Sequence, residues 1–331
     1  MKTENKETAA SVSSEKEVYE PDDINVYKPD VKDWYIPNHL QIETVTNLCN
    51  ARCIMCPIDD WKRTPNIMDN EIYTEVLKKF LPYRDQLKFL SLFCCGESLL
   101  DKNFPDKVRI ASEMEFNSIG IASNCDLLDD HTAQALIENG LDTVICGIDG
   151  ITKETHETIR TRTNYDNIHA NVLNFIKRRN ESDKKTKVLI RFIRQQENKH
   201  EWEEYYDYWI SRIDPEYGDD VVKFDVHNVG GELKDYESRD IIKFEAASDI
   251  ICQDVFEKFL VYSDGAVALC NGDDNGFFEI GNVLETEPME IYNGEVFNRY
   301  RQQMLEGNIN NLEHCDTCTI PRSRMYKTPI D

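Results

Sequence analysis

The sequence predicts an α/β fold, a partial (β/α)6 TIM-like barrel followed by a smaller C-terminal unit. Between His39 and Val226, short apolar runs alternate with amphipathic helical patterns, which is typical of a parallel sheet covered by helices. About six such pairs are present, fewer than the eight of a closed barrel. After Val226 the alternation stops, and a loop-rich stretch follows that holds the last four of the eleven cysteines.

Residues 1–36 are polar and charged, with scattered proline, so we expect a mobile tail with a short docked segment at Trp34–Ile36. Residues 37–229 form the predicted barrel. Its strands are the apolar runs Leu40–Val45, Phe89–Phe93, Ser118–Ala122, Thr143–Ile148, Val188–Ile193 and Val221–Val226. Its helices are the amphipathic segments Asn70–Phe80, Asp106–Met114, Asp130–Asn139, Asn167–Arg179 and His200–Ile213.

Residues 230–331 form the predicted C-terminal unit, which has little apolar periodicity of its own. One hairpin is expected, from Phe259–Tyr262 through a turn at Ser263–Gly265 to Val267–Cys270.

The net charge of −24, from 62 acidic and 38 basic side chains, repels phosphate backbones and anionic lipid. We therefore expect no nucleic-acid partner and no membrane. The sequence has neither an apolar run of spanning length nor an apolar stretch in its first residues, so we expect a cytoplasmic protein. Because cytosolic cysteines stay reduced, metal ligation or catalysis is the leading explanation for eleven of them.

Cys49, Cys53 and Cys56 follow the first predicted strand with the spacing C-x3-C-x2-C. Three thiolates on one loop can hold three corners of a cubane iron–sulfur cluster and leave one iron open to a small molecule. A zinc loop and three incidental buried cysteines are the alternatives. Zinc sites usually take four protein ligands, and no nearby cysteine or histidine offers the fourth.

This motif resembles the signature of the radical S-adenosylmethionine (SAM) superfamily, with Met55 in its hydrophobic position. The resemblance implies a [4Fe–4S] cluster on the three cysteines, with SAM bound at the open iron. Further segments at the ends of predicted strands match the family's SAM-contacting positions, namely Cys95-Gly96-Glu97, Ser123-Asn124, Asp149 in Gly147–Gly150, and Arg160. Cysteine replaces the first glycine of the family's Gly-Gly-Glu motif, and Gly147 replaces a serine. Taken singly, Gly96 could be a turn glycine, Asp149 a helix cap and Arg160 a solvated cation.

A second set of cysteines, Cys252, Cys270, Cys315 and Cys318, lies in the C-terminal unit. Four thiolates suit either a cubane cluster or a structural zinc ion, and their spacing does not choose between the metals. The segment Val261–Cys270, the Gly281-Asn282-Val283 triplet and the closing C-x2-C are similar to a twitch domain, the shortened SPASM extension. That similarity implies an auxiliary [4Fe–4S] cluster, and the layout resembles the twitch-type dehydrogenase of an aminocyclitol, 2-deoxy-scyllo-inosamine.

Four cysteines remain outside both sets. Cys94, Cys95 and Cys125 lie at strand ends, where a thiol could return a hydrogen atom to a substrate radical; Cys125 is our candidate donor. Burial as a small apolar side chain is the alternative for each of them, and we expect it for Cys146. Asp273 and Asp274 are expected to be solvated, whereas Arg191 and Arg194 could face the cavity or its rim.

The resemblance implies that a reduced cluster cleaves SAM to a 5′-deoxyadenosyl radical, which abstracts hydrogen from a C–H bond. With an auxiliary cluster as electron acceptor, we expect two-electron dehydrogenation of a carbinol in a sugar, aminocyclitol or similar polar metabolite. The expected partners are this small molecule and a reductant of the flavodoxin or ferredoxin type. The alternatives are radical epimerisation with a cysteine donor, modification of a ribosomal peptide, and a non-enzymatic metal-binding protein. A tail of about 36 residues is short for the usual peptide-binding domain.

Overall fold

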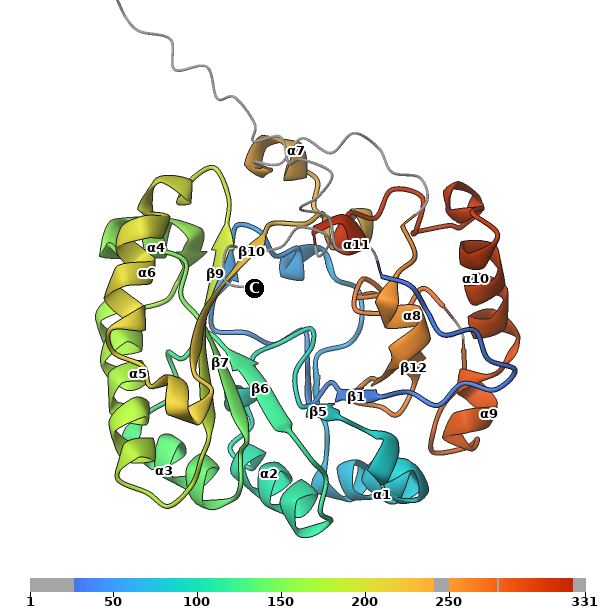
Figure 1. Ribbon diagram of the computed structural model, residues 1–331, viewed down its shortest axis with the longest axis horizontal. Helices are drawn as coiled ribbons and strands as arrows, with labels where there is room; N and C mark the ends of the chain where they lie inside the picture. The colour runs from blue at the N-terminus through green and yellow to red at the C-terminus, as the bar shows by residue number, and fades with distance from the viewer. Residues whose placement is uncertain (1–26, 241–249, 279, 324–331) are drawn as a thin grey trace, which may run out of the picture.

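The computed structural model describes residues 27–240, 250–278 and 280–323, and a curved sheet of eight strands lies at its centre (Figure 1). The strands are, in spatial order, β10 (Asp220–Asp225), β9 (Lys187–Arg194), β7 (Thr143–Gly147), β6 (Ile119–Ser123), β5 (Phe89–Ser91), β1 (His39–Ile42), β11 (Lys258–Val261) and β12 (Val267–Ala268). All neighbours are parallel except β11 and β12. The α/β prediction is therefore confirmed, and the six predicted barrel strands occur in order.

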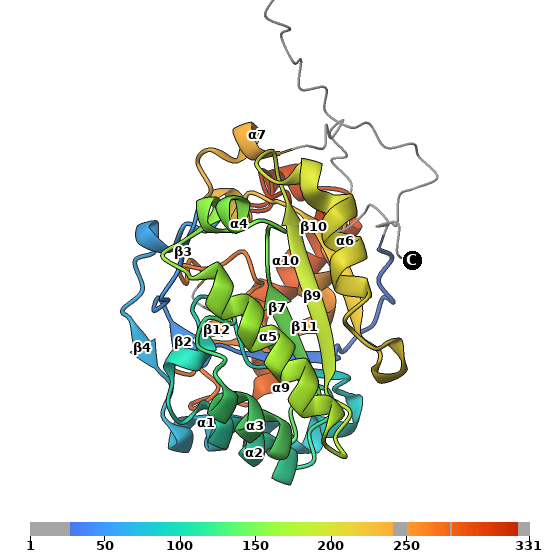
Figure 2. The ribbon, with the colours of Figure 1, turned by 90° about the vertical axis from the view of Figure 1, so that its left-hand side faces the viewer.

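Helices α1 to α6 cover the outer face of this sheet, and Figure 2 shows α5 and α6 running along β7, β9 and β10. Their bounds are Asn70–Phe80 (α1), Phe104–Glu113 (α2), Asp130–Glu138 (α3), Lys153–Ile159 (α4), Tyr165–Asn180 (α5) and Trp202–Ile210 (α6). Five of them were predicted. The sixth, α4, has only seven residues, which is too short to show a clear apolar period.

Two short ribbons lie outside the main sheet. Strand β2 (Val45–Thr46) pairs antiparallel with β4 (Asn66–Ile67), and β3 (Arg52–Cys53) pairs antiparallel with β8 (Arg160–Thr161). The apolar run that predicts one strand from Leu40 to Val45 is thus divided between β1 and β2. Single 3-10 turns occur at Ile58–Asp60, Leu81–Gln86, Ser98–Leu100, Lys199–Glu201, Pro215–Tyr217, Val229–Gly231 and Ile309–Asn311.

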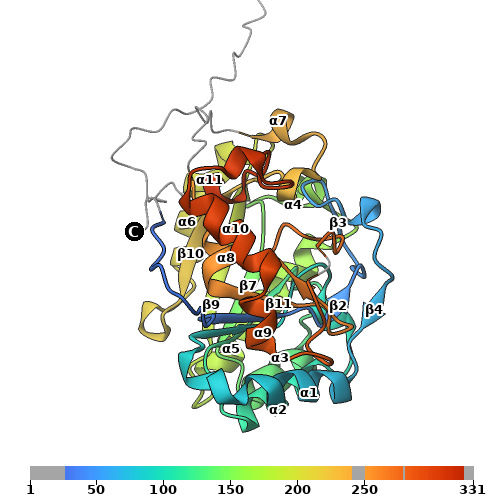
Figure 3. The same cartoon turned by 90° about the vertical axis from the view of Figure 1, so that its right-hand side faces the viewer.

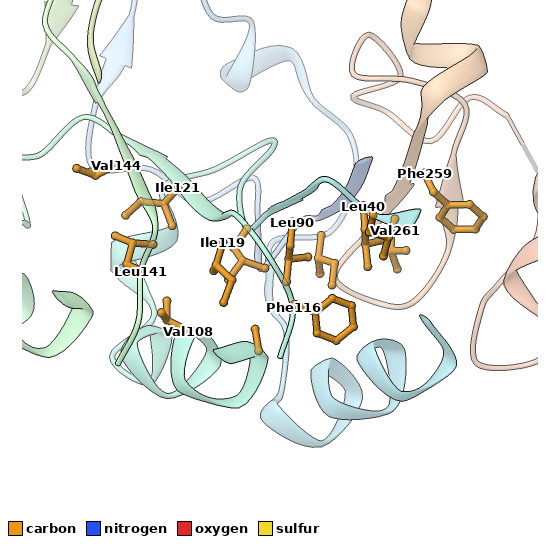
Figure 4. Close-up of a cluster of buried hydrophobic side chains, with 14 of the residues drawn as sticks. Leu40, Leu90, Val108, Phe116, Ile119, Ile121, Leu141, Val144, Phe259 and Val261 are labelled. Atoms are coloured by element: carbon orange, nitrogen blue, oxygen red, sulfur yellow. The ribbon is translucent and has the colours of Figure 1, made fainter. Parts of the chain in front are cut away.

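The main core lies between the sheet and the helices packed on it, which include α1 to α3, α5, α6 and helices of the C-terminal half. Figure 4 shows strand and helix side chains meeting in one apolar layer, with Leu40, Leu90, Val108, Phe116, Ile119, Ile121, Leu141, Val144, Phe259 and Val261 labelled. The labelled strand residues are almost completely buried because parallel strands at the centre of a sheet have both faces covered.

The predicted C-terminal hairpin is β11–β12, and it extends the barrel sheet. Strand β11 runs parallel to β1, with His39 opposite Lys258 and Ile42 opposite Val261. The remaining helices of this half are α7 (Tyr236–Arg239), α8 (Gln253–Glu257), α9 (Pro288–Tyr292), α10 (Glu295–Leu305) and α11 (Ile320–Ser323) (Figure 3). The hydrogen-bonded sheet therefore crosses the domain boundary predicted at residue 230.

The described part of the predicted tail, residues 27–36, is docked on this half of the molecule. Tyr35 is buried; its N–H donates to Asn293 Oδ1 at 2.8 Å, and Asn293 Nδ2 donates to the Tyr35 carbonyl at 3.0 Å. Trp34, which we expected to dock, is 55% exposed. Residues 1–26 lie outside the described residues. Within the described ranges, no helix combines the length and the apolar character needed to cross a bilayer.

Replacing Phe259 by alanine should lower the free energy of unfolding by about 3–5 kcal/mol, because a fully buried aromatic side chain leaves a cavity. Its ring centroid lies 5.1 Å from that of Phe80 in α1 and 5.6 Å from that of Tyr292 in α9, so it joins the two halves. The measurement is denaturant unfolding. As a control, Phe89→Ala changes a side chain that is 51% exposed and should cost about 1 kcal/mol or less. Equal losses would contradict this account.

Candidate functional site

The first three cysteines lie on a loop above the carboxyl ends of the barrel strands. All three thiols are free and half-buried. The β3–β8 ribbon sets Cys53 opposite Arg160, and Arg160 Nη1 approaches the Cys53 sulfur at 3.8 Å. The Cys49 sulfur accepts from the Ala51 N–H at 3.4 Å and lies 3.8 Å from Asn124 Nδ2. Donors directed at sulfur favour thiolates, the form that binds metal.

Burial disfavours the thiolate form of these three cysteines in the protein without metal. It raises the pKa of Cys49 to about 11 and also raises the pKa of Cys53 and Cys56. Thiols of this kind ionise when a bound cation compensates the lost hydration. The donor set of three close cysteines therefore fits a metal cluster.

A buried ion pair supports this loop from below. Asp149, directly after β7 and Ile148, has no exposed surface, and its Oδ2 accepts from Arg160 Nε at 2.7 Å. Its Oδ1 accepts from the Ile193 N–H at 2.6 Å, and its own N–H donates to His156 Nδ1 at 3.3 Å. Asp149 therefore positions Arg160 rather than presenting a free carboxylate.

The glycine at position 147 leaves room for this arginine. A Cβ at Gly147 would lie 2.7 Å from Arg160 Nη2 and 2.9 Å from its Cζ. Glycine therefore replaces the family's serine at position 147 because the Arg160 guanidinium fills the space that a side chain would need.

Glu97 organises the neighbouring strand ends. Its Oε1 accepts from Ser123 Oγ at 2.9 Å and from the Leu99 N–H at 3.2 Å, and its Oε2 accepts from the Asn124 N–H at 2.8 Å. Burial raises the pKa of Glu97, and these hydrogen bonds oppose that shift. Asn124 Nδ2 in turn donates to Asn50 Oδ1 at 2.8 Å, which ties the end of β6 to the cysteine loop.

Gly96 is required by a close backbone approach. A Cβ there would lie 2.5 Å from the Val45 carbonyl oxygen and 3.0 Å from that of Leu48. The neighbouring N–H of Glu97 donates to the Leu48 carbonyl at 2.8 Å, so the segment is joined to the start of the cysteine loop.

At this site, two buried guanidinium nitrogens, Arg160 Nη2 and Arg191 Nε, have no hydrogen-bond partner among the described residues. Gly147 and Arg191 are opposite each other on β7 and β9. Burial lowers the pKa of Arg191, and the positive charge of Arg160 lowers it further. Buried guanidinium N–H groups without acceptors call for an anionic ligand group. The carboxylate of SAM suits these atoms, so the residues present fit SAM as well as the cluster.

The second set of cysteines also converges. Cys252, Cys270, Cys315 and Cys318 line one pocket, together with Gly230, Gly272, Phe278 and His314. Burial raises the pKa of Cys270, and the other three thiols raise it further. Four converging thiols with few polar neighbours fit one fully ligated metal centre.

The structure gives no geometric support to Cys125 as a hydrogen donor, so that role stays a prediction. Its thiol has no exposed surface and lies in the main core beside Cys146. Cys94 is half-buried, and its sulfur lies 3.4 Å from that of Cys95. Arg194 forms a buried ion pair with Asp225 at 2.7 Å.

Sequence reasoning missed a polar cluster at the ends of β1, β5 and β11. Arg63 donates to both oxygens of Glu43, at 2.7 and 2.5 Å, and its guanidinium stacks on Tyr262. Asp273 and Asp274, expected to be solvated, are 5% and 3% exposed, so that expectation was wrong. Glu43 could have been found, because it directly follows the first strand. Asp274 gives no such signal, because its burial depends on contacts with distant segments.

Comparison with known proteins agrees with both cysteine sets. Residues 44–208 match the family model of the radical SAM superfamily, and residues 252–319 match SPASM, an iron–sulfur cluster-binding domain. The chain belongs to the radical SAM superfamily. Cys49, Cys53 and Cys56 lie in the first segment, and the four cysteines of the second set lie in the other. A radical SAM enzyme of this type uses SAM and [4Fe–4S] clusters, including an auxiliary one, so the predicted cofactors are confirmed.

Two curated relatives match short regions. A tungsten-containing aldehyde ferredoxin oxidoreductase cofactor-modifying protein from Pyrococcus furiosus is 30% identical over 105 residues, which is 32% of this chain and 29% of that protein. A GTP 3′,8-cyclase from Chlorobaculum tepidum is 31% identical over 125 residues, 38% of this chain and 37% of that protein. The matches thus span only about a third of either relative.

Solved structures share the fold over most of the chain. BtrN in complex with AdoMet and 2-DOIA superimposes with a TM-score of 0.58 and 20% identity, covering 88% of this chain and 97% of BtrN. Streptococcus suis SuiB bound to its precursor peptide SuiA gives 0.59 and 14%, covering 87% and 71%. Native anSMEcpe with AdoMet and the Kp18Cys peptide gives 0.59 and 17%, covering 80% and 83%.

We expect Arg160 to bind the SAM carboxylate, so Gly147→Ala, which displaces Arg160, should weaken SAM binding by about 10- to 100-fold, the loss of charge-assisted hydrogen bonds worth about 1.5–3 kcal/mol. The measurement is the dissociation constant of SAM for the cluster-loaded protein by anaerobic equilibrium dialysis. Gly120→Ala, on the adjacent strand β6, is the matched control, because its Cβ would meet only ordinary contacts at 3.6 Å. Unchanged SAM affinity in Gly147→Ala would show that Arg160 does not contact SAM.

Proposed function

We propose that this radical SAM enzyme dehydrogenates a carbinol in a sugar, aminocyclitol or similar small polar metabolite. The observation that carries the proposal is the second thiol pocket, attached to a hairpin that continues the barrel sheet. A metal centre built there stays at a fixed position relative to the barrel interior. The likeness to BtrN, a dehydrogenase of the same twitch type, covers nearly the whole of that chain and supports this reaction class.

In the proposed arrangement, Cys49, Cys53 and Cys56 hold the first [4Fe–4S] cluster, and Cys252, Cys270, Cys315 and Cys318 hold the second. When bound, the clusters and SAM supply a 5′-deoxyadenosyl radical for hydrogen abstraction and a one-electron acceptor for the resulting substrate radical. Arg160 and Arg191 bind the anionic end of SAM.

The chain also encloses the reaction site. The loop after Cys270 meets the segment after Cys56: the Lys62 N–H donates to Asn275 Oδ1 at 2.7 Å, and Arg63 Nε donates to the Asp274 carbonyl at 2.8 Å. The same two segments contact Glu43, which follows β1, and Cys95, which follows β5. A closed site protects a carbon radical from water and from other hydrogen donors.

Peptide modification is the second candidate function, because SuiB and anSMEcpe were both solved with peptides bound and share the fold equally well. The two candidates differ in substrate size. Hydrogen transfer from an aminocyclitol into 5′-deoxyadenosine supports the first, and transfer only from a peptide supports the second.

Anaerobically reconstituted protein should hold about eight irons per chain and should cleave SAM after reduction by dithionite. Cys53→Ala should retain about four irons and lose 5′-deoxyadenosine formation altogether. Cys270→Ala should also retain about four irons but keep SAM cleavage while losing the ketone product, since only its electron acceptor is missing. The readouts are iron and sulfide content with chromatography of the products, and Cys146→Ala is the control. One zinc ion in place of the four irons of the auxiliary site would contradict the proposed dehydrogenation, because zinc cannot accept an electron.

A further inference from the structure

Asp274 lies where the two halves of the molecule meet. It is four residues after Cys270, and its Oδ1 accepts from the Cys95 thiol at 3.0 Å. Cys95 directly precedes Gly96 and Glu97, which adjoin the first cysteine loop. Asp274 is also close enough to Cys56 to help raise the pKa of that thiol. It therefore lies between the residues proposed for SAM and those proposed for the auxiliary cluster.

The second carboxylate oxygen of Asp274 is the unusual feature. Asp274 is 3% exposed, yet its buried Oδ2 has no hydrogen-bond partner among the described residues. A buried, unpaired carboxylate oxygen is costly to a fold, so it requires an explanation such as a ligand donor.

Two of the neighbouring carboxylates, Glu43 and Asp273, are satisfied by the chain itself. Glu43 accepts from both guanidinium nitrogens of Arg63 and from Thr46 Oγ1 at 2.8 Å. Asp273 Oδ1 accepts from the Phe277 N–H at 2.6 Å. Arg63 gives Asp274 a hydrogen bond only at the backbone carbonyl. Of Glu43, Asp273 and Asp274, only Asp274 has a side-chain oxygen left for a ligand; the nearby Glu232 also has a buried oxygen, Oε2, without a partner among the described residues.

The surroundings of Asp274 bring the pKa of its carboxyl group close to neutral pH. Its pKa is raised to about 7, chiefly by burial; the negative charges of Glu232 and Glu43 add to this rise, while the Cys95 thiol and Arg63 oppose it. A carboxylate with a pKa near the working pH can both take up and release a proton.

We propose that Asp274 is the proton acceptor of the reaction, with its Oδ2 receiving the hydrogen bond of the substrate hydroxyl; this rests on the proposed dehydrogenation. After hydrogen abstraction at the carbinol carbon, the O–H bond breaks and its proton passes to Asp274. An auxiliary iron–sulfur cluster held by Cys252, Cys270, Cys315 and Cys318 would accept the unpaired electron as the C=O bond forms. The proton and the electron thus both leave toward the loop that begins at Cys270.

A first test needs no substrate. In the holoenzyme, Asp274→Asn should melt above the wild type at pH 8, and this difference should shrink as the pH falls to 5. The sign follows because a carboxylate with a raised folded-state pKa makes the fold less stable as the pH rises from its unfolded value toward about 7. The control is Asp264→Asn in the exposed turn between β11 and β12. A difference that does not change with pH would overturn the proposal.

A second test follows the atoms, with 2-deoxy-scyllo-inosamine deuterated at its carbinol carbon as the probe. Asp274→Asn should still move deuterium into 5′-deoxyadenosine but should form ketone about 100-fold more slowly, without the rise in rate through pH 7 expected for the wild type. Asp274→Glu should restore part of the rate, and Asp273→Asn should stay within about two-fold of wild type. Ketone formation at the wild-type rate in Asp274→Asn would overturn the proposal.

The two proposals fail in different ways. If the wild type moves no deuterium from this probe, the proposed aminocyclitol dehydrogenation is wrong. The melting experiment still tests whether the pKa of Asp274 is raised in the folded protein. If the wild type makes ketone and Asp274→Asn does so equally well, the dehydrogenase stands and the proton acceptor is another group.

Discussion

The site depends on one buried ion pair, Asp149 with Arg160. One oxygen of Asp149 fixes the end of β9 through the Ile193 N–H, and the other fixes the guanidinium of Arg160. The backbone of Arg160 forms β8, which pairs with Cys53. A single carboxylate thus connects two barrel strands to the metal-binding loop. Removing either charge would leave the other buried without a partner, and that is strongly destabilising.

Much of the barrel could be predicted from sequence because local residue patterns indicate each of its strands and most of its helices. Alternating apolar runs predicted the six strands, and the cysteine spacing predicted both metal-binding sets, which the domain matches support. The strand-end positions of Glu97, Asn124 and Asp149 followed from the rule that side chains after parallel strands meet at one edge. Each of these inferences needs only a few neighbouring residues.

What could not be predicted depends on contacts between distant segments. No pattern indicates that β11 pairs with β1, because the free edge of a hairpin strand can pair with any other edge strand. An acidic loop residue such as Asp274 is normally exposed, and only the packing of its loop against Cys95 and Arg63 buries it. Likewise, the sequence places Cys125 at a strand end but does not indicate where its thiol lies. In the structure Cys125 has a left-handed backbone, with φ of +63°, and its thiol lies in the core.

The pairing of β1 with β11 also sets an order of events during synthesis. Asn38 and Glu257, which flank this pair and are hydrogen-bonded to each other, are 219 positions apart. At ribosomal rates of about 5–20 residues per second, β1 waits roughly 10–40 s for its neighbour. During that interval one edge of the nascent barrel is open beside the Cys49–Cys56 loop. The Cys49–Cys56 loop is therefore complete well before the hairpin that closes the sheet is synthesised.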